Sequence, residues 1–429
     1  MKKNLFLVAL VAVSALMTAC QQQQTVCCEE RPRVLVSTDI GGTDPDDNQS
    51  MAHLLMYSDS YQLEGIISSP SYGDGNMGEI LRMIDLYEKD FPELRTQYPD
   101  LMSPEALRAI TKQGRKGGAP MCGYSEPTEG SEWIVQCARR STDEPLYVLV
   151  WGGLEDVAQA LHDAPEIADR IRIYWIGGPN KKWSVNSYLY LVENHPNLWF
   201  IECNAAYRGF ISSSGEEPDY ESYFDRVMAD AGHLGPDFGN YYEGNIKMGD
   251  TPSLLYVMQG DPNDPTSESW GGKFEPQHHS PRTVFHRSTT EADTVACYSI
   301  IEWRFRGPKI DREVGSPVMT ATIDCQPWAG YYLGDGVYML RYCPKQPASL
   351  DYVIASDIKE LDGLSGRFTV SGEWPGQPTE DGFSVGKNWM TDVAAPEFFE
   401  GKWQGAATVR KWRKEVLDDW AERWQVLKK

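Results

Sequence analysis

Short apolar runs recur along the first part of the chain, and segments with helical spacing lie between them. The runs have the length and the β-branched or aromatic content of buried strands: RVLVS (33–37), LEGII (63–67), LYVLVW (146–151), IRIYWI (171–176) and LWFIE (198–202). Between them, apolar residues recur with helical spacing, as at Met51, Leu54 and Leu55. Strands that alternate with helices predict an α/β fold with a mostly parallel sheet flanked by helices.

The pattern changes after residue 281. In residues 282–376 helical patterns are few, and apolar positions alternate as they do in antiparallel strands. About five to seven short strands of this kind predict a β-sandwich. Helical spacing returns in the last segment, 377–429, as is typical of an α/β core. The sandwich is therefore predicted to be an insertion into an α/β domain that spans 33–281 and resumes at 377.

The beginning of the chain has the features of an export signal. Residues 1–19 combine a Lys-Lys start, an apolar run and small residues before Cys20, and they are too short for a membrane-spanning helix. LMTAC (16–20) resembles the lipobox, at which a signal peptidase cuts before a lipid-carrying cysteine. We expect a lipid on Cys20 and a polar tether over 20–32, with simple secretion as the alternative. The lipid would be the protein's only membrane contact, in the periplasm or cell envelope, at the outer membrane of a Gram-negative bacterium.

The charge of the chain limits its ligands. The formal net charge is −22, from 62 Asp and Glu against 40 Lys and Arg. This balance opposes binding to nucleic acid, because a phosphate backbone is bound by clustered Lys and Arg. The cysteines between Cys122 and Cys343 have no CxxC spacing, which argues against a zinc site. The sequence therefore favours small or neutral ligands, and it leaves the oligomeric state open.

An acidic loop follows the first predicted strand. The stretch TDIGGTDPDDNQS (38–50) places four aspartates within nine residues. In open α/β folds, ligands bind at this carboxyl edge of the sheet. One aspartate could cap the next helix, but like charges this close repel unless a cation lies among them. Because Ca²⁺ accepts about six to eight oxygen ligands, the loop predicts a calcium site, with capping and solvation as the alternative.

The loop resembles the motif of the nucleoside hydrolases, in which a strand is followed by an Asp and then by an Asp-Asp pair that opens a helix. Asp39 lies seven residues before Asp46, so the loop is longer than in that motif. With IYWIGGPNKKWSVNSY (173–188) and MGDTPSLLYVMQG (248–260), this longer form is similar to the nucleoside-hydrolase-like proteins of polysaccharide-degrading bacteria, one branch of which is described as cellulose-binding. With IIEWRFRGP (300–308) and WAGYYLGDGVYMLRYC (328–343), residues 282–376 resemble the immunoglobulin-like domain of several glycoside hydrolases.

The resemblance implies a role for each residue that matches the family motif. Asp39 is expected to bind Ca²⁺ and to take a proton from the calcium-activated water. Asp46 matches the catalytic-site carboxylate that holds sugar hydroxyls. Asp47, Asp250 and the backbone carbonyl of Trp151 are expected to complete the metal site.

Further sugar contacts are predicted at the ends of other strands. Asn204 and its neighbour Glu202 follow a strand at the same edge, with local turn chemistry as the alternative. Asn186 is a weaker candidate of the same kind. Trp183 and Trp270 could stack on a sugar ring, although buried packing is the commoner use of Trp.

One departure from the family bears on mechanism. Gly249 stands where many nucleoside hydrolases have a His that assists the departing base. The sequence thus predicts a Ca²⁺-dependent hydrolase of glycosyl bonds, with a sugar, a nucleoside-like molecule or an oligosaccharide as its partner. The alternative is a carbohydrate-binding protein that retains the metal pocket without turnover, and a weaker one is a structural surface protein in which calcium only braces the loop.

Overall fold

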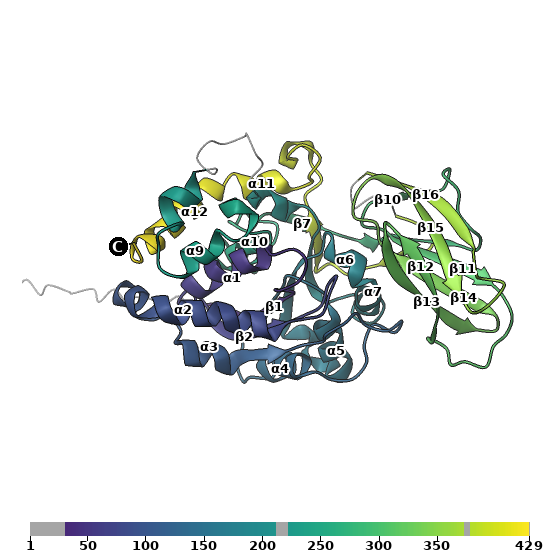
Figure 1. Ribbon diagram of the computed structural model, residues 1–429, viewed down its shortest axis with the longest axis horizontal. Coiled ribbons are helices and arrows are strands. Elements are labelled where there is room, and N and C mark those ends of the chain that lie inside the picture. The colour runs from purple at the N-terminus through teal and green to yellow at the C-terminus, as the bar shows by residue number, and fades with distance from the viewer. Residues whose placement is uncertain (1–30, 212–221, 373–377, 429) are drawn as a thin grey trace, which may run out of the picture. The chain divides into compact units, whose positions relative to one another are not determined.

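The computed structural model describes residues 31–211, 222–372 and 378–428 (Figure 1). Cys20, the predicted signal and most of the predicted tether lie outside the described residues. Within the described part of the chain, no helix is both long and apolar enough to cross a membrane. Residues Pro32–Lys429 form one compact unit.

The first sheet has eight strands, and most residues of its inner strands are buried. Its order is β3-β2-β1-β4-β5-β6-β18-β7. The strands are β1 (Arg33–Thr38), β2 (Gln62–Ser68), β3 (Thr111–Gln113), β4 (Leu146–Val150), β5 (Ile171–Ile176), β6 (Trp199–Cys203), β7 (Phe274–Pro276) and β18 (Trp389–Asp392). Neighbours pair in parallel, except that β7 runs antiparallel to β18. Parallel strands buried on both faces require continuous apolar runs, as the sequence has.

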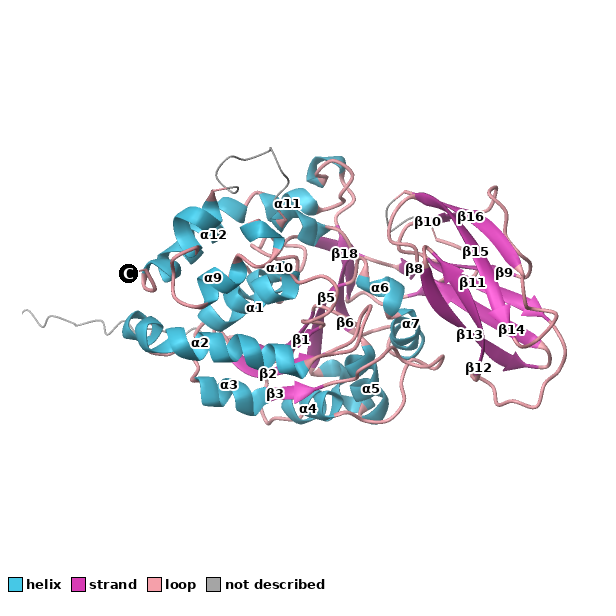
Figure 2. Ribbon diagram, in the orientation of Figure 1, coloured by secondary structure: helices cyan, strands magenta, loops and turns pink. Residues whose placement is uncertain are grey.

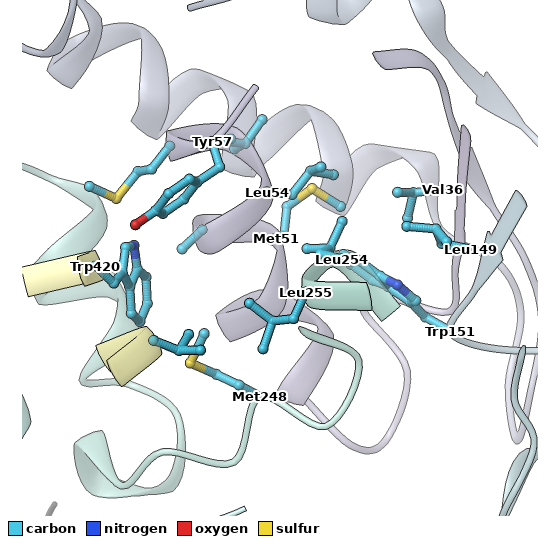
Figure 3. Packing of buried hydrophobic residues seen from close by; sticks show 14 of the residues in the cluster. Val36, Met51, Leu54, Tyr57, Leu149, Trp151, Met248, Leu254, Leu255 and Trp420 are labelled. Atoms are coloured by element: carbon cyan, nitrogen blue, oxygen red, sulfur yellow. The ribbon is translucent and has the colours of Figure 1, made fainter. Parts of the chain in front are cut away.

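Helices fill the connections and form two cores with the sheet. They are α1 (Asp46–Met56), α2 (Met77–Gln97), α3 (Pro104–Ile110), α4 (Glu129–Ala138), α5 (Glu155–Asp163), α6 (Asn180–Trp183), α7 (Val185–Asn194), α9 (Leu234–Phe238), α10 (Thr251–Met258), α11 (Ala406–Arg410) and α12 (Arg413–Gln425). Val36 of β1 belongs to a cluster with α1, α2, α10 and α12, whereas its neighbour Leu35 belongs to a cluster with α4, α5 and α7. Side chains of a strand alternate between its two faces, so each core covers one face of the sheet. In Figure 3, Met51 and Leu54 of α1 lie beside Leu254 of α10.

The second sheet belongs to the inserted domain (Figure 2). Its eight strands have the order β10-β16-β15-β12-β13-β14-β11-β9. They are β9 (Arg282–Phe285), β10 (Thr294–Ala296), β11 (Ile300–Arg306), β12 (Pro317–Ile323), β13 (Gln326–Gly334), β14 (Val337–Tyr342), β15 (Ala348–Ser356) and β16 (Ser365–Ser371). Pairing is antiparallel except at the two edges, and Trp303, Tyr352 and Phe368 lie in a separate core.

The chain returns to the first sheet after this insertion. The short strands β8 (His279–Ser280) and β17 (Phe383–Ser384) pair where the chain enters and leaves the β domain. β18 then pairs in parallel with β6, and Trp420 and Trp424 of α12 are fully buried in the first core. The predicted fold class, a mostly parallel α/β domain with an inserted β domain, is confirmed. The exact domain boundaries stay a prediction.

Candidate functional site

The acidic loop lies between the end of β1 and the start of α1. Thr38, the last residue of β1, donates a hydrogen bond from Oγ1 to Asp47 Oδ1 and accepts one from the backbone N–H of Ile40. The N-cap residue of α1 is Pro45, and no side chain caps the helix. Asp46 and Asp47 are instead the first two residues of α1. Helix capping therefore does not explain the aspartates.

Three carboxylates meet at this position. Asp46, Asp47 and Asp250 each offer an oxygen within 4.8 Å of the others, and we call this group the acidic cluster. Asp250 comes from the N-terminus of α10, which packs against α1. Asp39 adjoins the cluster, since its carboxyl group hydrogen-bonds with the side chains of Ser71 and Asp47. The structure thus brings Asp39, Asp46, Asp47 and Asp250 together, and their roles stay a prediction.

Gly152 permits the approach of Asp39 to the loop after β4. A Cβ atom on Gly152 would lie 2.7 Å from Cβ of Asp39 and 2.8 Å from Oγ of Ser69, closer than side chains can pack. Trp151, the preceding residue, is fully buried in the first core (Figure 3). Its indole N–H donates a hydrogen bond to Oγ of Ser253 at 2.8 Å. Its carbonyl accepts a 2.6 Å hydrogen bond from Nδ2 of Asn180 and has a second lone pair.

Burial and mutual repulsion disfavour the charged forms of these carboxyl groups. Burial raises the pKa of Asp39 to about 6 despite hydrogen bonds from Ser71 and Asp47. Burial, followed by the charge of Asp44, raises the pKa of Asp46 to about 7. Burial and the neighbouring carboxylates raise the pKa values of Asp47 and Asp250 well above the usual range. The cluster thus holds negative charge only against a substantial cost.

The positive group nearest the cluster does not neutralise it. Among the described residues, Lys247 is the cation within 4.0 Å of a cluster oxygen, with Nζ 3.9 Å from Oδ2 of Asp46. Its closer partner is the exposed Asp44. Burial raises the pKa of Asp44, but hydrogen bonds from Lys247 and Tyr242 outweigh this and leave it below the usual value. Lys247 therefore compensates the rim of the loop rather than the cluster.

The donor set fits a hard divalent cation. All the side-chain groups are carboxylates, and Oδ2 of Asp250 is buried without a hydrogen-bond partner in the described part of the chain. A buried carboxylate oxygen without a donor needs a counter-charge. Oxygen ligands of this kind suit Ca²⁺. Asp46, predicted to bind sugar, is in the cluster, whereas Asp39, predicted as a ligand, lies beside it.

A cavity of about 770 Å³ opens over the acidic cluster. The predicted residues Asp39, Asp46, Asp47, Trp151 and Asp250 all line it. Much of the remaining wall is aromatic: Tyr72, Trp183, Tyr207, Tyr242 and Trp403. Its volume lies in the usual range for small-molecule sites.

The other predicted sugar contacts do not line the cavity. Glu202 is fully buried and accepts hydrogen bonds from Nζ of Lys181 at 2.7 Å and from the hydroxyl of Tyr188 at 2.8 Å. Burial raises its pKa, but the charge of Lys181 prevails and the pKa lies below the usual value. Asn204 donates from Nδ2 to Glu202, and its Oδ1 has no hydrogen-bond partner among the residues described.

Asn186 lies where the α/β domain contacts the β domain. Its Nδ2 donates to the hydroxyl of Tyr331 at 3.1 Å, and its Oδ1 accepts from Arg341 at 3.2 Å. Trp183 lines the cavity as predicted, and Trp270 is not among the lining residues. Asn186 therefore has a structural position, and Trp183 is the stacking candidate that the cavity retains.

Gly249 makes room for Asp46. A Cβ atom at this position would lie 2.5 Å from Oδ2 of Asp46 and 3.6 Å from Cδ2 of Tyr207. A His here would displace the Asp46 carboxylate. No described residue that lines the cavity is a histidine. The departing group of a substrate would meet Tyr207, Tyr242 or an indole instead.

Several wall residues escaped prediction because they come from distant segments. Tyr72 follows β2 at the same sheet edge, and that strand-end position was a usable signal. Trp403 comes from the segment after β18, and Lys345 from the segment after β14. No pattern in the sequence around these two residues indicates that they line the cavity.

A family model described as "Cellulose-binding Sde182, nucleoside hydrolase-like domain" matches residues 33–274. A nucleoside hydrolase-related hypothetical protein from Saccharophagus degradans, associated with carbohydrate metabolism, is 18% identical; the match covers 80% of this chain and 99% of that one, with a TM-score of 0.48. An inosine-uridine preferring nucleoside hydrolase from Bacillus anthracis is 17% identical over 59% of this chain and 87% of its own, with a TM-score of 0.38. None of the curated proteins compared with the chain matches it. The family match confirms the resemblance inferred from the sequence motifs.

Proposed function

We propose a function from the premise that the chain belongs to the family described as cellulose-binding Sde182, nucleoside hydrolase-like domain. The protein binds a carbohydrate or nucleoside-like molecule in the cavity over the acidic cluster and hydrolyses a glycosyl bond there with the help of Ca²⁺. A fragment of a plant polysaccharide or a ribosyl compound is the substrate.

The observation that carries this proposal is the uncompensated charge at the base of the cavity. Three carboxylates lie within 4.8 Å of one another, and Asp39 adjoins them. Buried carboxylates in proteins are stabilised by a cation, by hydrogen bonds or by a bound metal ion. Here the charge faces a cavity of about 770 Å³ with aromatic walls. Such an arrangement supports a site that takes both a cation and a ring-shaped ligand.

Each residue of the site has a role in this reaction. Ca²⁺ would be held by the carboxylates of Asp46, Asp47 and Asp250 and by the carbonyl of Trp151. A bound Ca²⁺ lowers the pKa of a water molecule that it coordinates. Asp39, oriented by its hydrogen bond with Ser71, accepts the proton of the attacking water. Asp46 also lines the cavity, so its carboxylate can accept hydrogen bonds from sugar hydroxyls.

A second candidate function is carbohydrate binding without turnover. The observation that favours it is Gly249, together with the lack of a histidine among the described lining residues. Without an acid for the departing group, the reaction needs a good leaving group. The family description, which names cellulose binding, supports this candidate as well.

Hydrolysis assays with and without calcium separate the two candidates. Nitrophenyl glycosides, nucleosides and oligosaccharides would be incubated with the wild type and with Asp39→Asn. We expect calcium-dependent cleavage that falls by at least about a hundredfold in Asp39→Asn, because the proton acceptor is lost. Asp335→Asn is a matched control, since Asp335 is exposed in the β domain and pairs with Lys309. If a ligand binds but no substrate is cleaved, the hydrolase is excluded and the second candidate, a carbohydrate-binding protein, is supported.

We also propose that the protein is anchored in the cell envelope through a lipid on Cys20. The LMTAC stretch supports this location. Cys20→Ser should abolish labelling by a fatty-acid probe and leave the signal uncleaved. Continued labelling of the variant would exclude Cys20 as the anchor.

A further inference from the structure

The wall of the cavity that contains Arg208, Lys345 and Lys402 differs in charge from its base. We call these three residues the cationic wall. All of them line the same cavity as the acidic cluster. They come from three separate segments: the turn after β6, the segment after β14 and the segment after β18. Their convergence on one cavity cannot result from a local run of basic residues.

Each residue of the cationic wall lies over an indole ring. Nζ of Lys345 lies 5.5 Å from the centroid of Trp183, and Nζ of Lys402 lies 4.5 Å from that of Trp403. The guanidinium carbon of Arg208 is 3.9 Å from the same Trp403 ring. Cations are held at these distances by the ring quadrupole. At two places on its wall the cavity therefore combines an indole ring with a positive charge.

The two lysines of the wall have no counter-ion in the part of the chain that the structure describes. Neither Lys345 nor Lys402 has a carboxylate within 4.0 Å in the described residues. The neighbouring lysines differ, because Lys182 pairs with Asp324 and Lys247 pairs with Asp44. In a chain with a net charge of −22, acidic partners are abundant. Lys345 and Lys402 are thus available to an anionic group of a ligand.

We propose that the ligand is a sugar with an anionic substituent, a carboxylate or a sulfate ester, which is bound by the cationic wall. This inference rests on the proposed function of the cavity. An anion is repelled by the acidic cluster and attracted by the wall, so the charge pattern also fixes the orientation. The neutral hydroxyl groups face Asp39 and Asp46, and the charged substituent lies near Trp183 or Trp403.

Calorimetric titrations of the full chain in excess calcium test this inference. The probes are an oligogalacturonide, a sulfated oligosaccharide and a neutral cello-oligosaccharide of equal length. At low salt we expect one anionic probe to bind about tenfold more tightly than the neutral one, since exposed ion pairs contribute modestly. This advantage should shrink as salt is added. The tighter of the two anionic probes identifies the substituent.

Substitutions in the cationic wall test whether its lysines cause the preference for anionic probes. Lys345→Gln/Lys402→Gln should lower the affinity for the anionic probe about tenfold and leave that for the neutral probe within about twofold. Lys309→Gln is the matched control, because Lys309 is exposed in the β domain and outside the cavity. A melting temperature equal to that of the wild type shows that the double variant is folded.

Two results would overturn the inference. If the neutral probe binds as tightly as the anionic ones, or if the double variant keeps the preference for anions, the cationic wall does not select the ligand and only the proposed function survives. If none of the sugars binds, both the inference and carbohydrate recognition in this cavity are wrong.

Discussion

Buried carboxylates occur in two regions near the carboxyl ends of the strands of one sheet, and they differ in what balances their charge. Glu202 of β6 is fully buried with Nζ of Lys181 at 2.7 Å, and its pKa lies below the usual value. Within the described ranges, Asp47 and Asp250 are buried without such a partner, and burial raises their pKa values well above the usual range.

A third buried carboxylate extends the comparison. Glu302 of the β domain accepts hydrogen bonds from Arg304 at 2.7 Å and from Arg341 at 3.1 Å, and these cations outweigh burial and lower its pKa. The chain thus supplies a cation to both of these carboxylates, Glu202 and Glu302.

Asp392, which is fully buried outside the cavity, instead accepts hydrogen bonds from the backbone N–H groups of Asn204 and Ala205, and burial raises its pKa to about 7. The acidic cluster differs from all three because it faces a cavity, where we propose that it binds a cation from solution.

Removal of the internal cation should have the largest effect on stability. Lys181→Met leaves Glu202 as an unpaired buried charge, which should lower the free energy of unfolding by about 3–5 kcal/mol. Urea denaturation in excess calcium measures this loss. The double variant Lys181→Met/Glu202→Gln should recover much of it, because the unpaired charge is gone. A loss under about 1 kcal/mol in Lys181→Met would show that Lys181 does not stabilise Glu202.

Replacing one carboxylate by an amide should change the free energy of unfolding in opposite directions in the two regions. In the presence of a chelator, Asp47→Asn removes a repelled buried charge, and it should raise the free energy of unfolding by about 1–2 kcal/mol at neutral pH. Glu202→Gln should lower it, because that charge is paired. Urea denaturation of both variants in chelator measures the two changes in the free energy of unfolding. Destabilisation by Asp47→Asn in chelator would mean that its charge is already compensated.

The stability of the chelated wild type should fall as pH rises. Burial raises the pKa of Asp39 to about 6 and that of Asp46 to about 7, against 3.8 in the unfolded chain. Between these values the folded protein binds more protons than the unfolded one, so stability falls with pH by up to about 1.4 kcal/mol per unit for each group. Glu202 acts oppositely, since its contribution is lost only below its lowered pKa. Melting temperatures in chelator from acid to neutral pH test the slope, and a rise toward neutral pH would contradict it.

The smallest effect on stability is expected at Gly249. In Gly249→Ala the new methyl group would lie 2.5 Å from Oδ2 of Asp46, which can rotate away. We expect the affinity for calcium to fall several-fold while the free energy of unfolding changes by about 1 kcal/mol or less. Gly401→Ala is the control, because a Cβ there meets no atom within 4 Å, although its φ of 57° adds local strain. Unchanged calcium affinity in Gly249→Ala would show that Asp46 is not a ligand.

The sequence predicted those strands of the fold whose burial produces an apolar run in the local sequence. The strands β1, β2, β4, β5 and β6 contain short apolar runs, because parallel strands covered on both faces are largely apolar. The short strands β3, β7 and β18 were not predicted. Three or four residues carry no period, and their pairing depends on neighbours that are distant in sequence.

The residues of the candidate site that lie close together in the chain could also be predicted from the sequence, whereas their partners from distant segments could not. Asp39, Asp46 and Asp47 share one loop, so their crowding is visible in the sequence. Glu202 and Asn186 were predicted to bind sugar because they carry polar groups near this edge. Their partners, Lys181 and Arg341, could be found only from the three-dimensional fold. Position at a strand end shows where a side chain lies, and the partner decides what it does.

Calorimetric melting of the wild type in excess calcium and in excess chelator tests the central claim most directly. If the acidic cluster awaits a divalent cation, the folded protein binds Ca²⁺ better than the unfolded chain does. At about a hundred times the dissociation constant, this stabilises the fold by about 2.7 kcal/mol. The account predicts a melting temperature several degrees higher in calcium than in chelator, and no such difference in Asp47→Asn. Equal melting temperatures of the wild type in the two solutions would contradict it.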